Sequence, residues 1–70
     1  MLSGLNFKMR FKIIRKLRKV GAVSEEKAVA PNEAGLDLQE IGWLQYLAGG
    51  TLSSTPIKKT KDRRYYVQSH

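Results

Sequence analysis

The first twenty residues constrain the fold most, because they combine seven cations and no acid with apolar residues at helical spacing. The apolar residues recur every three or four positions and form one stripe: Phe7, Phe11, Ile14 and Leu17, widened by Ile13 and Val20. Gly21 is a typical residue at the end of a helix. The pattern predicts an amphipathic helix over residues 5–20, whose apolar stripe packs against the rest of the chain.

A chain of 70 residues leaves room for one small domain, which we expect to span residues 1–70. Apolar residues make up 41% of the chain, which is too many for a typical disordered segment. The same length argues against an enzyme with a deep substrate pocket. The chain has no cysteine, which excludes disulfide frameworks, cysteine zinc sites and thiol nucleophiles.

Charge is distributed unevenly along the chain. The 13 Lys and Arg residues outnumber 6 Asp and Glu residues, for a net charge of +7. Residues 1–20 carry +7, residues 21–56 carry −4, and residues 57–70 carry +4. This balance favours a polyanionic partner, either nucleic acid or an acidic membrane surface. The two basic ends would form one positive surface if they meet in space.

The acidic middle of the chain carries signals for helices and turns. Ser24 precedes two glutamates, which is typical of a helix N-cap and predicts a short helix over 24–30. Pro31 ends that helix, because proline cannot continue it. Residues 31–35 read as one further helical turn that Gly35 closes.

The next segment begins with an N-capping pattern. Asp37 and Glu40 have the spacing of a capping box, with aspartate in place of the usual serine or threonine. This start predicts a third helix over residues 38–48, ended by two glycines. Its apolar residues supply an inward stripe: Leu38, Ile41, Leu44, Leu47 and Ala48.

The last part of the chain reads as a β-hairpin over residues 57–67. Two short strands flank a turn at residues 61–63. Successive strand residues face opposite sides, so we expect Tyr65 and Val67 to share the core side while Tyr66 points away. Residues 68–70 are expected to be frayed. The fold class is therefore mostly α with a C-terminal β-hairpin, an α+β arrangement.

This order of elements resembles a small winged helix-turn-helix domain of the archaeal type, with three helices and a wing. The resemblance depends on residues 16–24 (KLRKVGAVS), on the step 34–36 (AGL) and on residues 57–67 (IKKTKDRRYYV). The chain departs from that pattern at two points. Its turn reads Asp62-Arg63 where Asp-Gly is more usual, and the connection from residue 49 to residue 56 is long.

The resemblance implies that the third helix enters the major groove of DNA. The candidate contacts to bases or to a protein partner are Gln39, Trp43, Gln45 and Tyr46 on that helix and Tyr66 in the hairpin. A glutamine amide can pair with adenine. However, this helix has no Lys or Arg, and Glu40 would lie near phosphates, which is unfavourable. In the alternative interpretation, Trp43 and Tyr46 pack in the core or against a partner protein.

Phosphate contacts are predicted from both basic ends. The first helix supplies one group of cations at helical spacing: Lys8, Lys12, Arg15, Lys16 and Lys19. The hairpin supplies a second group, interleaved with tyrosines: Lys58, Lys59, Lys61, Arg63 and Arg64. A solvated helix face usually mixes positive and negative charges, so an acid-free group of cations indicates contact with a polyanion.

Residues that could support catalysis are few. His70 is the only histidine and lies at the end of the chain, and Ser53-Ser54 has no evident base nearby. We therefore expect no enzyme activity, no cofactor and no metal. No apolar run is long enough to span a bilayer, and the N-terminus lacks a secretory signal, although it shares features with an organellar presequence. The expected location is cytoplasmic.

The leading hypothesis is a small basic protein that binds nucleic acid mainly through phosphate contacts. The family resemblance favours DNA over RNA and is compatible with a regulatory role. The alternatives are an RNA- or ribosome-associated protein and a protein-interaction module, including a homodimer formed through Trp43 and Tyr46.

Overall fold

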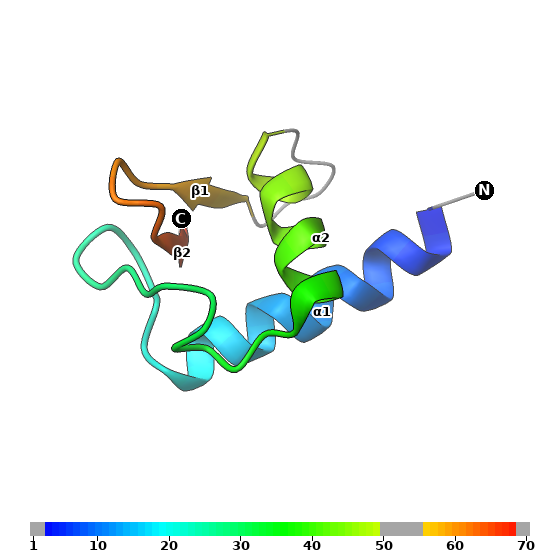
Figure 1. Ribbon diagram of the computed structural model, residues 1–70, viewed down its shortest axis with the longest axis horizontal. Coiled ribbons are helices and arrows are strands. Elements are labelled where there is room, and N and C mark those ends of the chain that lie inside the picture. The colour runs from blue at the N-terminus through cyan, green and yellow to red at the C-terminus, as the bar shows by residue number, and fades with distance from the viewer. Residues whose placement is uncertain (1–2, 50–55, 69–70) are drawn as a thin grey trace.

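The computed structural model describes residues 3–49 and 56–68. It contains two helices, α1 (Ser3–Lys19) and α2 (Leu38–Gly49), followed by the strands β1 (Ile57–Lys59) and β2 (Tyr65–Val67) (Figure 1). The strands form an antiparallel hairpin at the C-terminal end of the chain. The predicted α+β class and the C-terminal hairpin are therefore confirmed, whereas the prediction of three helices is not.

Helix α1 ends in a Schellman motif. The amide of Ala22 donates to the carbonyl of Leu17 at 2.8 Å, and the amide of Gly21 donates to that of Arg18 at 3.0 Å. Gly21 has φ 83°, a left-handed conformation that glycine adopts without a steric penalty. The predicted end of this helix is thus correct to within one residue.

The predicted helix over residues 24–30 is wrong. This segment instead pairs with the outer edge of β2, through isolated bridges from Val23 to Val67 and from Val29 to Tyr65. The Val29 amide donates to Tyr65 at 3.0 Å, and the Tyr65 amide donates back at 2.9 Å. A helix of seven residues has little stability of its own. Pairing with a strand distant in sequence satisfies the same backbone groups and buries Val29 in the core.

The predicted turn over 31–35 and the predicted capping box are both present. Gly35 closes the turn with φ 76°, and the Leu36 amide donates to the Pro31 carbonyl at 3.2 Å. The Glu40 amide donates to Asp37 Oδ1 at 2.7 Å, and the Asp37 amide donates to Glu40 Oε1 at 3.1 Å. These contacts fix the start of α2 where the sequence predicted it.

The hairpin turn reaches from Thr60 to Arg64. The Thr60 amide donates to the Arg64 carbonyl at 2.7 Å, and Arg63 adopts a left-handed φ of 60°. This arrangement matches a three-residue hairpin loop, in which glycine commonly occupies the left-handed position. Gln68 was expected to be frayed, but its amide donates to Pro56 at 3.1 Å; residues 69–70 lie outside the described part.

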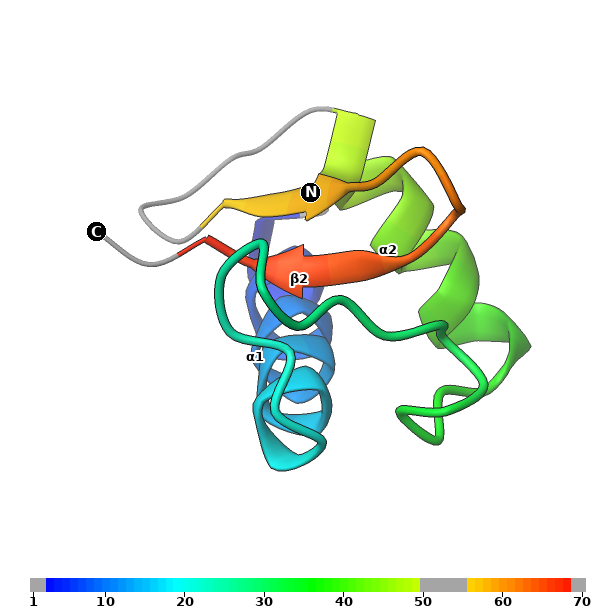
Figure 2. The same cartoon turned by 90° about the vertical axis from the view of Figure 1, so that its left-hand side faces the viewer.

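The core lies where the two helices and the hairpin meet. Helix α1 packs against α2 and β2, and β1 packs against α2, so the hairpin lies across both helices (Figures 1 and 2). The largest fully buried side chains come from all four elements: Ile13, Leu17, Leu44, Leu47, Ile57, Tyr65 and Val67. Tyr65 and Val67 share the core side of β2, as predicted from strand alternation.

Three members of the predicted apolar stripes are exposed. Phe7 and Phe11 on α1 retain 55% and 63% of their accessible surface, and Leu38 at the start of α2 retains 87%. Arg10 takes the place of the two phenylalanines on the buried side of α1, with 4% exposed. The positions 10, 13, 14 and 17 follow helical spacing, so the buried side of α1 is rotated from the predicted one.

Candidate nucleic-acid interface

One face of α1 presents only cations at its charged positions. Side chains that lie opposite the buried stripe on the helix are directed to solvent. The exposed cations on this face are Lys8, Lys12, Arg15, Arg18 and Lys19. The helix contains no acidic residue, so none of these charges has an acidic neighbour one turn away. We call these five residues the α1 basic surface.

Lys16 was predicted to belong to this group, but it is engaged within the chain. Its ammonium lies 2.5 Å from Glu40 Oε1 and donates to the Gly35 carbonyl at 3.3 Å. Glu40 was predicted to face solvent and phosphates, yet it is buried at the start of α2. The ion pair therefore joins α1 to α2, and Lys16 is the member of the predicted set least suited to contact a phosphate.

The hairpin presents a second group of cations. Those that are exposed and form no ion pair within the described residues are Lys58, Lys59, Lys61 and Arg63, which we call the hairpin basic surface. Arg64 differs, because its Nη1 donates to the Ala28 carbonyl at 3.4 Å and lies 4.0 Å from Glu33. Arg64 therefore attaches the hairpin to the segment that precedes α2.

The two basic surfaces lie on separate elements that pack against a shared core. Helix α1 and the hairpin pack against the shared core through their apolar sides. In Figure 1, α1 runs below α2, and the hairpin lies to the left of α2.

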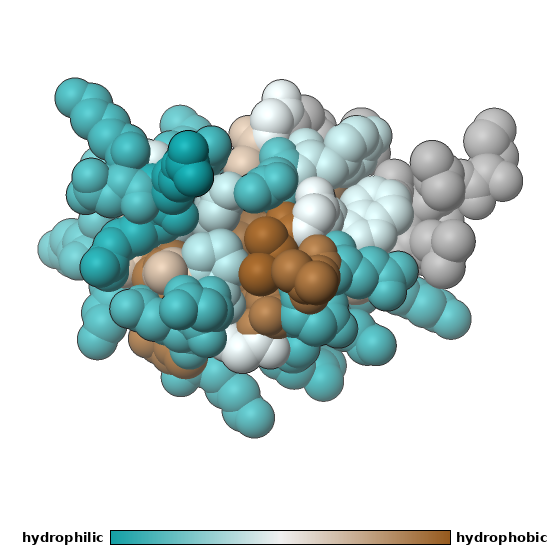
Figure 3. Space-filling view, viewed as in Figure 1, coloured by the Kyte–Doolittle hydropathy of each residue, from teal (hydrophilic) through white to brown (hydrophobic). Residues whose placement is uncertain are grey.

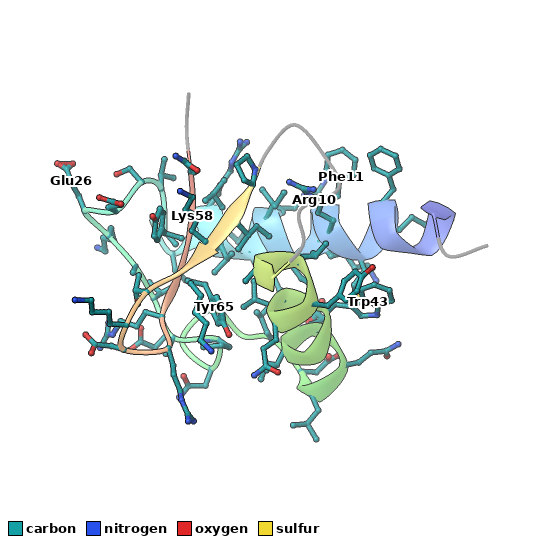
Figure 4. The ribbon with its side chains drawn as sticks, turned by 90° about the horizontal axis from the view of Figure 1, so that it is seen from above. Arg10, Phe11, Glu26, Trp43, Lys58 and Tyr65 are labelled. Atoms are coloured by element: carbon teal, nitrogen blue, oxygen red, sulfur yellow. The ribbon has the colours of Figure 1, made fainter. Side chains whose placement is uncertain are left out.

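A cleft of about 580 Å³ lies between α2 and the hairpin. The Pro31 turn and the C-terminal half of α2 line one side, and Lys59, Arg63 and Tyr65 line the other. Figure 4 shows Tyr65 between the hairpin and α2. Gln45, one of the predicted contacts, also lines the cleft. The cleft thus combines two cations with one amide.

The outward face of α2 carries no charge. Gln39, Gln45 and Tyr46 are exposed as predicted, and Trp43 is partly buried against the core. The Trp43 and Tyr46 rings form an edge-to-face pair with centroids 5.5 Å apart. The cations of the chain therefore lie on the elements that flank α2 rather than on α2 itself.

Tyr66 is on the side of β2 away from the core, as predicted, but the segment over residues 24–30 covers it. Its side chain is 5% exposed, and its hydroxyl donates to Glu25 at 3.1 Å. Burial, that hydrogen bond and the charge of Glu25 together raise the pKa of the Tyr66 phenol. The ring is thus unavailable for stacking on a base in this conformation.

Sequence reasoning missed the two most unusual features of α1. Phe7 and Phe11 form an exposed stacked pair with ring centroids 6.1 Å apart and an interplanar angle of 18°. Figure 4 shows Phe11 on the side of α1 away from α2. Arg10 is buried, and none of its three guanidinium nitrogens has a hydrogen-bond partner within the described part of the chain. Burial lowers the pKa of Arg10.

Residues 3–49 and 56–68 contain no group of His, Cys, Asp or Glu side chains suited to hold a metal ion. Neither helix combines the length and apolar character needed to cross a membrane. His70 and Ser53-Ser54 lie outside those residues. Comparison with protein families, with characterised proteins and with solved structures finds no match to this chain.

Proposed function

We propose that this protein binds nucleic acid mainly through phosphate contacts made by the α1 and hairpin basic surfaces. The main support for this proposal is that these cations are exposed and have no acidic partner among the described residues. A chain that needed lysine only for solubility would mix both signs on such a face. Phosphate groups are the natural counterions for closely spaced Lys and Arg side chains.

The cleft between α2 and the hairpin supports a role for the hairpin as a wing. In the winged helix-turn-helix domains that the sequence resembles, a wing contacts the phosphate backbone beside the DNA-reading helix. Lys59 and Arg63 line the cleft together with residues of α2, which supports this role for the hairpin. Duplex DNA is therefore the first ligand to test, and the uncharged outer face of α2 favours binding with little sequence preference.

The exposed Phe7 and Phe11 pair favours a second class of ligand. Aromatic side chains beside cations stack on unpaired bases in proteins that bind single-stranded nucleic acids. The two rings lie on the same helix as the α1 basic surface. An RNA-associated function, with unpaired bases on these rings, is thus the runner-up to duplex binding.

A salt titration of binding tests the proposal. Duplex DNA, duplex RNA and a single strand of equal length would be compared by fluorescence anisotropy over a range of salt concentrations. For B-DNA, the slope of log K against log[salt] is about −0.9 for each phosphate contacted. Absence of binding to all three ligands at low salt would refute the proposed function.

Two variants, each with four cations replaced by glutamine, measure how much each basic surface contributes to the slope of log K against log[salt]. One variant carries K8Q, K12Q, R15Q and K19Q on α1, and the other carries K58Q, K59Q, K61Q and R63Q on the hairpin. If all four substituted cations contact phosphates, each variant should lose about 3–4 units of slope. Lys27 is an exposed cation outside both surfaces, so K27Q is the control and should leave the slope unchanged. Equal slopes for all variants would contradict the assignment.

A further inference from the structure

The solvent face of α2 is the feature that nucleic-acid binding does not explain. Its exposed positions carry no charge in a protein of net charge +7: Leu38, Gln39, Gly42, Gln45 and Tyr46. Leu38 and Tyr46 are among the most exposed large hydrophobic residues. Apolar side chains gather over α2 in the centre of the molecule in Figure 3. A contiguous uncharged patch of this kind is typical of an interaction surface.

Gly42 lies in the middle of this face, and its contacts within the described residues do not explain why it is glycine. Its φ is outside the left-handed range, so its backbone does not require glycine. A Cβ atom built there would meet nothing within 4 Å, so packing inside the chain does not require glycine either. Glycine is one of the poorest helix formers, and alanine would serve this helix better. A residue without a side chain at this position is useful if another backbone approaches closely.

The residues around Gly42 are arranged symmetrically. Leu38 and Tyr46 lie four positions before and after it, and Gln39 and Gln45 lie three positions before and after it. If two copies of α2 run antiparallel and cross at Gly42, Leu38 of each copy lies opposite Tyr46 of the other copy. Gln39 of each copy likewise lies opposite Gln45 of the other copy. Such reciprocity is the requirement for an interface with twofold symmetry.

We infer that α2 is the interface of a homodimer in which two copies of this chain pack antiparallel across Gly42. A shallow groove of about 420 Å³ on this face, lined by Leu38, Gln39, Gly42, Trp43 and Tyr46, offers room for a side chain of the second copy. Two copies that each carry +7 repel one another least where both surfaces are neutral.

Sedimentation velocity over a range of protein concentrations tests the inference without nucleic acid. The wild-type protein should reach the mass of two chains, and added salt should favour the dimer by screening the repulsion between copies. L38K and Y46E should each weaken the dimer at least tenfold. The combined L38K/Y46E variant should regain it, because the new opposite charges face each other across the twofold axis. V23K alters another exposed apolar side chain and should leave the dimer intact.

Gly42 provides a second, independent readout. G42A should raise the helix content and thermal stability of the monomer while weakening the dimer, because the added methyl groups separate the two backbones. A loss of association in a variant that is better folded cannot be attributed to misfolding. A protein that stays monomeric at all concentrations would overturn the inference, as would a dimer insensitive to L38K, Y46E and G42A. Nucleic-acid binding by such a protein would leave the proposed function intact.

Discussion

Replacing Arg10 by methionine should stabilise the protein. Arg10 is 4% exposed and occupies the buried side of α1 next to Ile13 and Ile14, although it carries a full charge. Its Nε and both Nη atoms lack a hydrogen-bond partner within residues 3–49 and 56–68. A guanidinium forms five hydrogen bonds in water, and no group of the described residues replaces them after folding. Methionine has a similar length and no polar group that requires a partner.

The size of the effect follows from the cost of that burial. A buried polar group without a partner costs about 1–3 kcal/mol, and a charged group costs more. Replacement of buried ionic groups by apolar residues of similar volume commonly stabilises a protein by about 1–4 kcal/mol. Arginine and methionine have similar helix propensities, so the backbone contributes little to the difference. We therefore expect Arg10→Met to raise the free energy of unfolding by about 2 kcal/mol, or the Tm by about 10 °C.

Urea unfolding measured by circular dichroism gives this free energy directly. Arg15→Met is the matched control, because it removes the same charge from an exposed position of the same helix. The control should change stability by no more than about 0.5 kcal/mol. The reasoning is refuted if Arg10→Met is no more stable than Arg15→Met, since the guanidinium would then be making interactions that offset its burial.

Three further variants test the contacts that position the basic surfaces. Glu40→Ala removes the bond from the Asp37 amide to Glu40 in the capping box and the Lys16 ion pair, so it should destabilise the protein by about 2 kcal/mol in urea unfolding. Arg63→Gly relieves a left-handed φ of 60° and should raise the Tm slightly, while lowering the magnitude of the salt slope for DNA by about 1. Folding raises the pKa of Tyr66 above its ordinary 10.0, so the unfolded phenol ionises first and wild-type stability should fall as the pH rises past that value. Tyr66→Phe should reduce this fall in urea midpoints measured on either side of that pH.

Local signals predicted the elements whose ends depend on nearby residues. The Asp37 and Glu40 capping box and the glycines at positions 21 and 35 act within a few residues, so their spacing alone identifies helix and turn ends. The hairpin was predictable for the same reason. The segment over 24–30 was not, because its conformation depends on the distant edge of β2. Its Ser24 cap signal produces only a turn, in which the hydroxyl accepts from Glu26 at 3.4 Å.

The buried side of α1 could not be assigned from periodicity alone. Two stripes at helical spacing share Ile14 and Leu17, and they differ in whether Phe7 and Phe11 or Arg10 continue them toward the N-terminus. Hydrophobicity favours the phenylalanines, and the prediction is wrong at Phe7 and Phe11, although Ile14 and Leu17 are buried as predicted. The N-terminal half of α1 extends beyond α2 in Figure 1, so the choice depends on tertiary shape rather than on local sequence. The same limit applies to Lys16, whose partner lies 24 residues away.

Acidic residues explain how the fold separates its charges. Asp37 precedes α2, and Glu40 lies in its first turn. Each carboxylate accepts a hydrogen bond from the backbone amide of the other residue, and Glu40 also pairs with Lys16. Glu25 accepts from Tyr66, and Glu33 lies near Arg64. The negative charge of the middle segment is thus largely used to hold the chain together, which leaves α2 with a neutral outer face. Among the described residues, most cations of the two ends are exposed and have no such partner, whereas Arg10 is buried and Lys16 and Arg64 are engaged within the chain. Folding therefore converts a linear pattern of charge into two basic surfaces and one uncharged surface, and these suit a polyanion and a second copy of the chain respectively.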